Sequence, residues 1–227
     1  QPTFDNFLEL FQLSQSTWVP FYRYLFNSLF IAGGGTVLYI FIASMAGFVL
    51  AKYRLPGIAL YIQVVIWAML FRPEVMGIPQ YIIITKLGLL NTYLAVILPA
   101  VASSLGVFMM RQFMTTIYDS LLDAARIDGA GDFGIYWRVA MPMVKPAWLT
   151  LTVFTFQGLW NMAGVQYIYD ESMKPLPYML SQVVSVGIAR AGAGAAVGLF
   201  LMLPPILIFV FAQRSVILTM AHTGIKE

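Results

Sequence analysis

Ionisable side chains are densest in one short stretch of this sequence, DAARIDGAGDFGIYWRVAMP, residues 123–142. Just before it, Ser120 precedes Asp123 at the spacing of a capping box, so Asp119 or Ser120 is expected to begin a helix. Gly129 is expected to end that helix, because glycine readily takes the left-handed conformation found at helix C-termini. Carboxylates and small residues in this arrangement can cap a helix and fit it closely against another protein.

A second short helix is expected directly after the glycine turn. Asp132 can cap it, and Pro142 is expected to end it. The first helix, of about nine residues, would be roughly 14 Å long, which is too short to cross a membrane. The two short helices together predict a compact helical knob over residues 119–142. Ala124 and Ala125 give it a face with small side chains. An ordinary loop folded on itself is the alternative.

No other group of residues indicates catalysis, metal binding or nucleotide binding. The sequence contains no cysteine, and its one histidine, His222, lies near the C-terminus. It has no G-x-x-x-x-G-K-[ST] motif, and Gly192, Gly194 and Gly198 miss the G-x-G-x-x-G spacing by one residue. Gly194 and Gly198 instead have the G-x-x-x-G spacing of packed membrane helices. We therefore expect no catalytic residue, no metal site and no cofactor on this chain.

The composition indicates that the elements around the knob lie in lipid. Of the 227 residues, 60% are hydrophobic and 10% are charged, and the mean hydropathy is +0.80. A soluble domain carries about 25% charged residues, so this chain cannot cover a globular surface with ions. Its 13 Lys and Arg against 10 Asp and Glu give a net charge of +3, which gives no indication of nucleic-acid binding.

Five apolar runs are long enough, or nearly so, to cross the hydrocarbon core, which takes about 20 helical residues. The charge-free runs are residues 24–51, 55–71, 87–110, 146–169 and 191–213. We interpret the short second run as part of a span over residues 57–80 that is broken or tilted near Pro73. The sequence predicts an all-α, polytopic bundle with five transmembrane spans.

The basic residues orient these spans. With residues 111–145 in the cytoplasm, eight of the 13 Lys and Arg residues lie inside and five outside, in agreement with the positive-inside rule. The predicted parts are an extracytoplasmic lead-in (1–20), a transmembrane domain (21–219) with a cytoplasmic loop (116–145) and an extracytoplasmic loop (170–190), and a cytoplasmic tail (220–227).

The knob resembles the EAA signature of the permease subunits of ABC importers. That signature is Glu-Ala-Ala, three residues, Gly, nine residues, then Ile-x-Leu-Pro. Here Asp123-Ala124-Ala125 is followed at the same spacings by Gly129 and by Val139-Ala140-Met141-Pro142. The departures are Asp for Glu, Val for Ile and Met for Leu. Three further stretches are similar to the carbohydrate, maltose-type branch of that family: LGLLNTYLAVILPA (87–100), GVFMMRQF (106–113) and FTFQGLWN (154–161).

The resemblance implies a type I ABC-importer permease fold in a bacterial plasma (inner) membrane, with the C-terminus and the EAA loop in the cytoplasm. Such a subunit imports sugar with a second permease subunit, a dimer of ATPase subunits that bind ATP and Mg²⁺, and an extracytoplasmic solute-binding protein. The coupling residues that it implies are Asp123, Ala124, Ala125, Ile127, Asp128, Gly129, Ala130 and Pro142. The family generally has six spans, and the first is expected to be missing here, which places residue 1 outside.

Candidates for the sugar pathway lie in the fourth span, because sugars stack on aromatic rings and bond to amides. They are Phe156, Gln157, Trp160 and Asn161. A buried packing pair is the alternative for Trp160 and Asn161, and the acidic residue that often follows this pair in relatives is replaced by Met162-Ala163-Gly164. The loop at 170–190 is expected to meet the binding protein; a simple connection is the alternative.

Three other functions stay open at this point. The first is a permease of the same type for a polyol, glycerol phosphate or opine. The second is a secondary transporter driven by an ion gradient, which needs ionisable residues inside the membrane; Arg72 and Glu74 are the nearest candidates. The third is a structural scaffold, which gives no reason for the knob.

Overall fold

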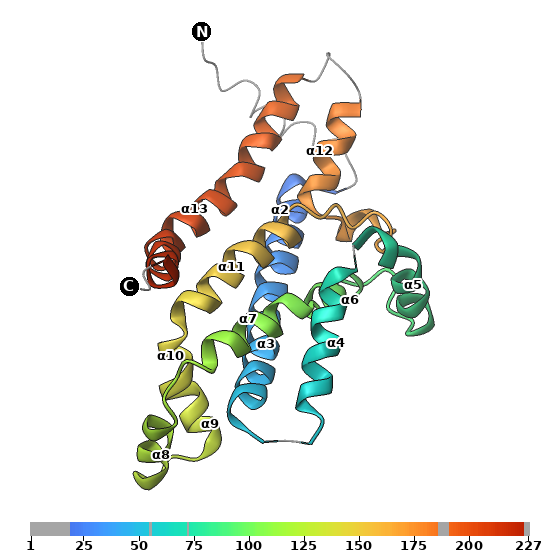
Figure 1. Ribbon diagram of the computed structural model, residues 1–227. Coiled ribbons are helices and arrows are strands. Elements are labelled where there is room, and N and C mark those ends of the chain that lie inside the picture. The colour runs from blue at the N-terminus through green and yellow to red at the C-terminus, as the bar shows by residue number, and fades with distance from the viewer. Residues whose placement is uncertain (1–18, 55, 72, 186–190, 225–227) are drawn as a thin grey trace. The chain divides into compact units, whose positions relative to one another are not determined.

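The computed structural model describes residues 19–54, 56–71, 73–185 and 191–224, and within these ranges the chain folds into helices, with no strand (Figure 1). The elements are α2 (Phe21–Leu29), the π-helical turn η1 (Phe30–Gly34), α3 (Gly35–Lys52), α4 (Ile58–Leu70), α5 (Pro73–Lys86), α6 (Leu94–Val101), α7 (Ser104–Met114), α8 (Asp119–Ile127), α9 (Asp132–Ile135), the π-helical turn η2 (Tyr136–Ala140), α10 (Met141–Met143), α11 (Lys145–Trp160), the 3-10 turn η3 (Glu171–Met173), α12 (Leu176–Ser185) and α13 (Ala191–Gly224).

The helices account for the predicted spans. Two helical stretches, Phe21–Lys52 and Gly194–Gln213, are each long and apolar enough to cross a membrane. The number rises to five if each of three helix pairs, separated by short breaks, is counted as one span. The structure therefore agrees with the five spans and the all-α fold that the sequence predicts. Residues 1–18 of the predicted lead-in, residues 186–190 of the predicted outer loop and residues 225–227 of the predicted tail lie outside the described residues.

Three spans differ in detail from the apolar runs; the third is divided into α6 and α7, with a bend of 42° between them. The second is divided into α4 and α5, which confirms the break expected near Pro73. The fourth run extends to residue 169, but α11 ends at Trp160, so the helix is shorter than the charge-free run that predicts this span. Gly164 has a positive φ of 64°, which marks a turn, and the apolar residues beyond Trp160 belong to that turn.

By its internal contacts the chain forms two compact units, each described here by itself. Unit 1 comprises Gln1–Thr36, Ile78–Ala100 and Phe154–Val210, and unit 2 comprises Val37–Gly77, Val101–Val153 and Phe211–Glu227. The knob belongs to unit 2, and the candidate pathway residues belong to unit 1.

Unit 2 has a hydrophobic core that joins α3, α7 and the knob. Its buried members are Tyr39, Ala43, Phe48, Met110, Met114, Ile117, Leu122, Ile135, Tyr136, Ala140, Val144, Ala147 and Leu151. Small residues let α3 and α7 approach closely, as expected for helices packed in lipid. A Cβ atom added to Gly47 of α3 would lie 2.8 Å from the backbone nitrogen of Arg111 in α7.

Unit 1 holds α2 and the segment that follows the turn after α11. Asn27 and Ser28 of α2 are buried although they are polar. Their side chains bond to the backbone of the segment around η3: the Asn27 amide donates to the carbonyls of Ser172 (2.9 Å) and Lys174 (3.0 Å), and Ser28 accepts from the nitrogen of Leu176 (2.7 Å). Buried polar groups need such partners, so these bonds fix the segment on α2.

Candidate functional site

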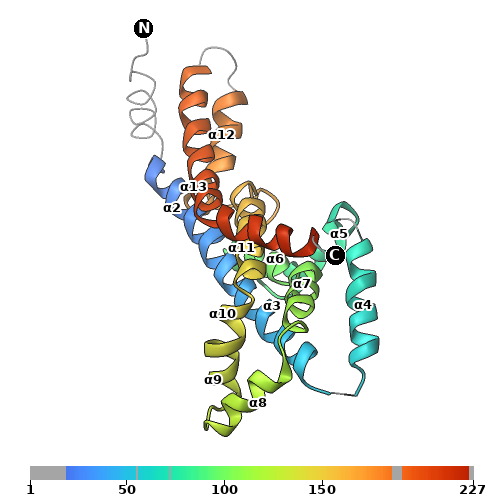
Figure 2. The same cartoon turned by 60° about the vertical axis from the view of Figure 1, so that its left-hand side comes forward.

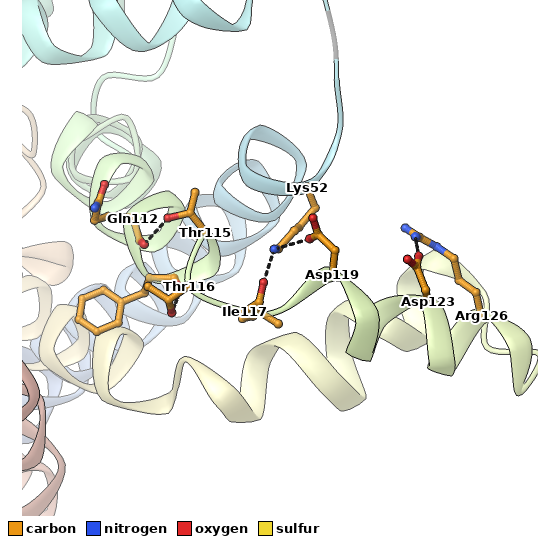
Figure 3. A network of polar contacts seen from close by, with 9 residues as sticks. Lys52, Gln112, Thr115, Thr116, Ile117, Asp119, Asp123 and Arg126 are labelled. Atoms are coloured by element: carbon orange, nitrogen blue, oxygen red, sulfur yellow. Dashed lines mark hydrogen bonds and ion pairs between the residues drawn. The ribbon is translucent and has the colours of Figure 1, made fainter.

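The knob begins where the sequence predicts but is capped differently. Its first helix, α8, starts at Asp119, and its N-cap residue is Tyr118, whose extended backbone accepts from Leu121 (3.2 Å). The predicted capping box of Ser120 and Asp123 is wrong. The Asp123 carboxylate instead accepts from Arg126, one turn further along, at 2.7 Å (Figure 3). A charge-assisted bond to Arg126 competes successfully for a carboxylate that could otherwise reach the helix start.

The glycine turn forms as predicted. Gly129 has a φ of 85°, in the left-handed region. The nitrogen of Ala130 donates to the carbonyl of Ala125 (3.0 Å), and that of Gly129 donates to the carbonyl of Arg126 (3.0 Å). These two bonds define a Schellman motif, which closes the C-terminus of α8.

The second helix of the knob is longer than predicted. Gly131 is the N-cap and Asp132 the first helical residue, so the expected cap by Asp132 is wrong by one position. Pro142 does not end the helix, because the chain passes through η2 and continues as α10 to Met143. In η2 the nitrogen of Met141 bonds to the carbonyl of Tyr136, five residues back. This widened turn accommodates the proline that a regular α-helix would exclude.

The buried face of the knob belongs to the core of unit 2. Both views place α8 and α9 at one end of that unit (Figures 1 and 2). Leu122 and Ile135 are almost completely buried, and Ala125 and Ala130 pack partly against the same core. The knob is therefore packed onto the span helices as a body, which excludes the ordinary loop that the sequence left open.

The opposite face of the knob is exposed and carries most of the residues that the EAA signature implies. Ile127 is 86% exposed, and Asp123, Ala124, Asp128, Gly129 and Pro142 are exposed as well. Ala124 thus faces outward while Ala125 faces the core, so the alanine pair is split between two faces. A hollow of about 510 Å³ lies beside the turn, with Ala125, Asp128, Gly129, Ala130, Trp137 and Arg138 among its lining residues.

A residue that the sequence analysis missed holds the start of the knob. The Lys52 ammonium, at the end of α3, donates to the carbonyl of Ile117 (2.5 Å) and to the carboxylate of Asp119 (2.7 Å), as Figure 3 shows. The Lys52 side chain is 5% exposed, whereas that of Asp119 is 80% exposed. The hydrogen bond and the charge of Lys52 hold the pKa of Asp119 below its usual range. The only signal in the sequence was that Lys52 ends the first charge-free run.

The candidate pathway residues lie at the end of α11 and directly after it, and they differ in exposure. Trp160 is fully buried, its indole nitrogen donates to the carbonyl of Leu201 (2.9 Å), and its ring stacks on that of Phe156 at 5.5 Å between centroids. Phe156 is buried too, whereas Gln157 and Asn161 are exposed. The structure therefore gives the two aromatic residues a packing role and leaves the two amides accessible.

The predicted outer loop contains regular structure within its described residues. Its first part is η3, whose N-cap Asp170 accepts from the nitrogen of Ser172 (2.9 Å). That bond lowers the pKa of Asp170. The second part is α12, with Pro177 in its first turn, where a missing N–H costs nothing. The segment is therefore folded into two short helices and is more than a simple connection.

Arg72, one candidate for ion coupling, lies outside the described residues.

Comparisons with known proteins agree with this geometry. Residues 34–220 match the family described as "Binding-protein-dependent transport system inner membrane component". The chain is 32% identical, over 226 residues, to the arabinooligosaccharides transport system permease protein AraQ of Bacillus subtilis (strain 168), with 99% of this chain and 79% of that protein covered. It is 30% identical, over 210 residues, to the sn-glycerol-3-phosphate transport system permease protein UgpE of Yersinia enterocolitica, with 86% and 71% covered.

A solved structure shares the fold. It is the crystal structure of a bacterial ABC transporter involved in the import of the acidic polysaccharide alginate, with a TM-score of 0.77 and 25% identity over 90% of this chain and 78% of that one. The family match spans most of the chain, including the knob with its Gly129 turn. Because the family is one of binding-protein-dependent transport, the match argues against a structural scaffold and against an ion-coupled transporter. This chain belongs to the family of inner membrane components of binding-protein-dependent transport systems, as a permease subunit with the type I ABC-importer fold.

Proposed function

We propose that this chain is the permease subunit of an ATP-driven sugar importer and forms one half of its translocation pathway, with a second permease subunit as the other half. ATP and Mg²⁺ bind to a dimer of cytoplasmic ATPase subunits, and an extracytoplasmic solute-binding protein delivers the sugar. AraQ belongs to an arabinooligosaccharide transport system and the alginate importer carries a polysaccharide, and both similarities support carbohydrate as the cargo.

The observation that carries this proposal is the form of the knob. It is packed on one face and exposed on the other, where Ile127 and the Gly129 turn protrude. Large apolar side chains are exposed on both helices of the knob, among them Ile127 (86%), Phe133 (61%) and Trp137 (54%), and several such side chains together are typical of a surface that another protein covers. The ATPase subunit is the partner proposed for this face, with Asp123, Ala124, Ile127 and Asp128 in contact with it.

The packing of the knob suggests how motion would pass into the membrane. Leu122, Ile135 and Tyr136 belong to the same close-packed core as α3 and α7. Close-packed elements move as bodies because their interiors do not deform smoothly. Closure of the ATPase dimer would therefore displace the knob together with the spans that it touches, and alternate access of the pathway would follow.

The proposed orientation places the knob in the cytoplasm and the segment around η3 and α12 outside. The distribution of Lys and Arg supports it. The outer segment, fixed on α2 by Asn27 and Ser28, is proposed as the surface that meets the solute-binding protein. On the pathway, Gln157 and Asn161 are proposed to bond to sugar hydroxyls, with Phe156 and Trp160 packed behind them.

A phosphorylated polyol is the second candidate cargo, because UgpE, named for sn-glycerol 3-phosphate, is nearly as similar as AraQ. Uptake into vesicles that contain the assembled complex and ATP would separate the two. We expect uptake of an arabinooligosaccharide or alginate oligosaccharide in the presence of the cognate binding protein. Uptake of sn-glycerol 3-phosphate alone would contradict the sugar assignment and leave the permease assignment intact.

Coupling through the knob is tested by a matched pair of glycine variants. Gly129→Val forces a β-branched residue into a positive φ, which costs at least about 1–2 kcal/mol and distorts the turn. Gly88 ends α5 in unit 1 with the same two-bond motif and a φ of 68°, and a Cβ at either glycine would meet open space. Gly88→Val therefore imposes the same strain far along the chain from the knob.

We expect the Gly129→Val complex to lose transport per ATP hydrolysed, and the Gly88→Val complex to lose only thermal stability. Solute uptake and ATP hydrolysis are measured on the same vesicles. Equal coupling ratios in the two variants would show that the turn has no special part in transmission and would remove the main support for the proposed role of the knob.

A further inference from the structure

The first observation concerns the position of the Lys52 ammonium. It is almost completely shielded from solvent, yet it lies at the end of a span helix, where a lysine usually extends to water. Its two partners, the carbonyl of Ile117 and the carboxylate of Asp119, both belong to the segment that begins the knob. A shielded ammonium is costly without such partners, so the three groups hold each other in place.

A second, independent tie lies deeper on the same helix. The hydroxyls of Ser44 in α3 and Tyr136 in η2 are 2.6 Å apart and buried. The Ser44 hydroxyl donates to the carbonyl of Phe41, so the Tyr136 hydroxyl is the donor between the two. The ring of Phe48 lies 5.6 Å from that of Tyr136. Ser44 and Lys52 are eight residues apart, which is about 12 Å along a helix, so α3 meets the knob at two separate levels.

We propose that Lys52 is a positioning residue that locks the knob to α3, so that α3 is the span that receives the movement of the knob. The proposal rests on the proposed function, because it needs a motor that moves the knob. Two points of attachment are required for this role: a single tie would let the knob pivot, whereas ties at Lys52 and Ser44 fix its angle as well as its position. Asp119 supplies the opposite charge, and the carbonyl of Ile117 fixes where the ammonium sits.

The proposal predicts that α3 and α8 keep a constant separation during the ATP cycle. The chain contains no cysteine, so Val49→Cys in α3 and Ser120→Cys in α8, both at exposed positions, can carry spin labels without a background signal. The distance between the labels is measured by pulsed electron paramagnetic resonance in the assembled complex. It is compared between the nucleotide-free state and the state trapped with ATP and vanadate.

We expect a narrow label–label distance that is the same in both states. In the Lys52→Met background the distance should shift or broaden between states, because the hydrophobic side chain keeps its length but loses charge and donors. Lys52→Arg should restore the constant distance. Lys145→Met, the same substitution at an exposed lysine at the start of α11, is the matched control and should leave the distance unchanged.

Each remaining outcome is decisive. A distance that changes between states in the otherwise native chain would overturn the proposal, as would a Lys52→Met distance that stays constant. A purely structural role would lower the thermal stability of the Lys52→Met complex without any dependence of the distance on nucleotide, and would also overturn it. If the ATPase subunits fail to co-purify with the native chain, both the proposed function and the proposed role of Lys52 are wrong. If they co-purify and the distance in Lys52→Met stays constant, only the proposed role of Lys52 is wrong.

Discussion

At the scale of single residues, the buried pair of Ser44 and Tyr136 offers an asymmetric test. Ser44→Ala leaves the Tyr136 hydroxyl buried without an acceptor, which costs about 1–3 kcal/mol. Tyr136→Phe leaves the Ser44 hydroxyl with its bond to Phe41, so we expect a loss of only about 1 kcal/mol. Thermal unfolding of the purified complex measures both variants. A larger loss in Tyr136→Phe than in Ser44→Ala would contradict the direction of this bond.

The ion pair of Lys52 and Asp119 predicts a particular dependence on pH. Because Lys52 lowers the pKa of Asp119, the stabilisation is fully present above the ordinary pKa of aspartate, about 3.9, and is lost as the pH falls through the lower value of the folded chain. We therefore expect Asp119→Asn to loosen the α3–α8 distance by the same amount throughout about pH 6 to 8. If the difference in α3–α8 distance between Asp119→Asn and the native chain varied with pH over this range, another titrating group would control the contact between Lys52 and Asp119.

At the scale of elements, several side chains of α2 bond to the segment around η3, and the buried amide of Asn27 makes the most bonds to it. Asn27 donates to two carbonyls of that segment and accepts from the hydroxyl of Tyr93 (2.8 Å). In Asn27→Ala these three bonds are lost, the carbonyl of Ser172 keeping its bond from Arg23 (3.2 Å), and hydrogen exchange at residues 172–176 should accelerate by about tenfold or more. Tyr24→Phe, which removes only the bond from Tyr24 to Glu171, is the comparison and should have a smaller effect. Similar exchange in both variants would show that Asn27 does not anchor the segment.

Elements were predictable from the sequence where their causes are local. The Gly129 turn follows from the glycine itself, and the structure confirms it, while the start of α8 at Asp119 is confirmed without the cap that predicted it. The capping box was wrong because Arg126 takes the carboxylate of Asp123. The end of the second knob helix was wrong because a π-helical turn precedes Pro142, and hydropathy alone could not distinguish α11 from the apolar turn that follows Trp160.

At the scale of the whole molecule, composition indicated lipid, because a chain with 10% charged residues has few alternatives, and the lengths of the charge-free runs were sufficient for the helical fold class and the five spans. The contacts that position the site were not predictable. Lys52 lies 65 residues from Ile117 and Asn27 lies 145 residues from Ser172, and no pattern within either stretch indicates its partner. The buried position of Trp160 likewise depends on a distant residue, because its indole nitrogen donates to the carbonyl of Leu201, 41 residues away.

The exposed apolar surface of the whole chain leads to a prediction about assembly. More than forty large apolar side chains are exposed in the described part of this chain, which is more than a single subunit in water could tolerate. Lipid and a second permease subunit are expected to cover them. We therefore expect affinity purification of the native chain in mild detergent to recover a second, related membrane protein and an ATPase in defined ratio. Recovery of the chain alone, in a stable monodisperse form, would contradict the assembly.

The account depends most directly on contact between the knob and the ATPase subunit, and Ile127 reports on it. In the cysteine-free chain, Ile127→Cys places a single thiol on a side chain that is 86% exposed. Its rate of reaction with a maleimide is measured in membranes that contain this chain and its partner permease, with and without the ATPase subunits. We predict fast labelling without the ATPase subunits and strong protection with them. Equal labelling rates in the two preparations would contradict the account.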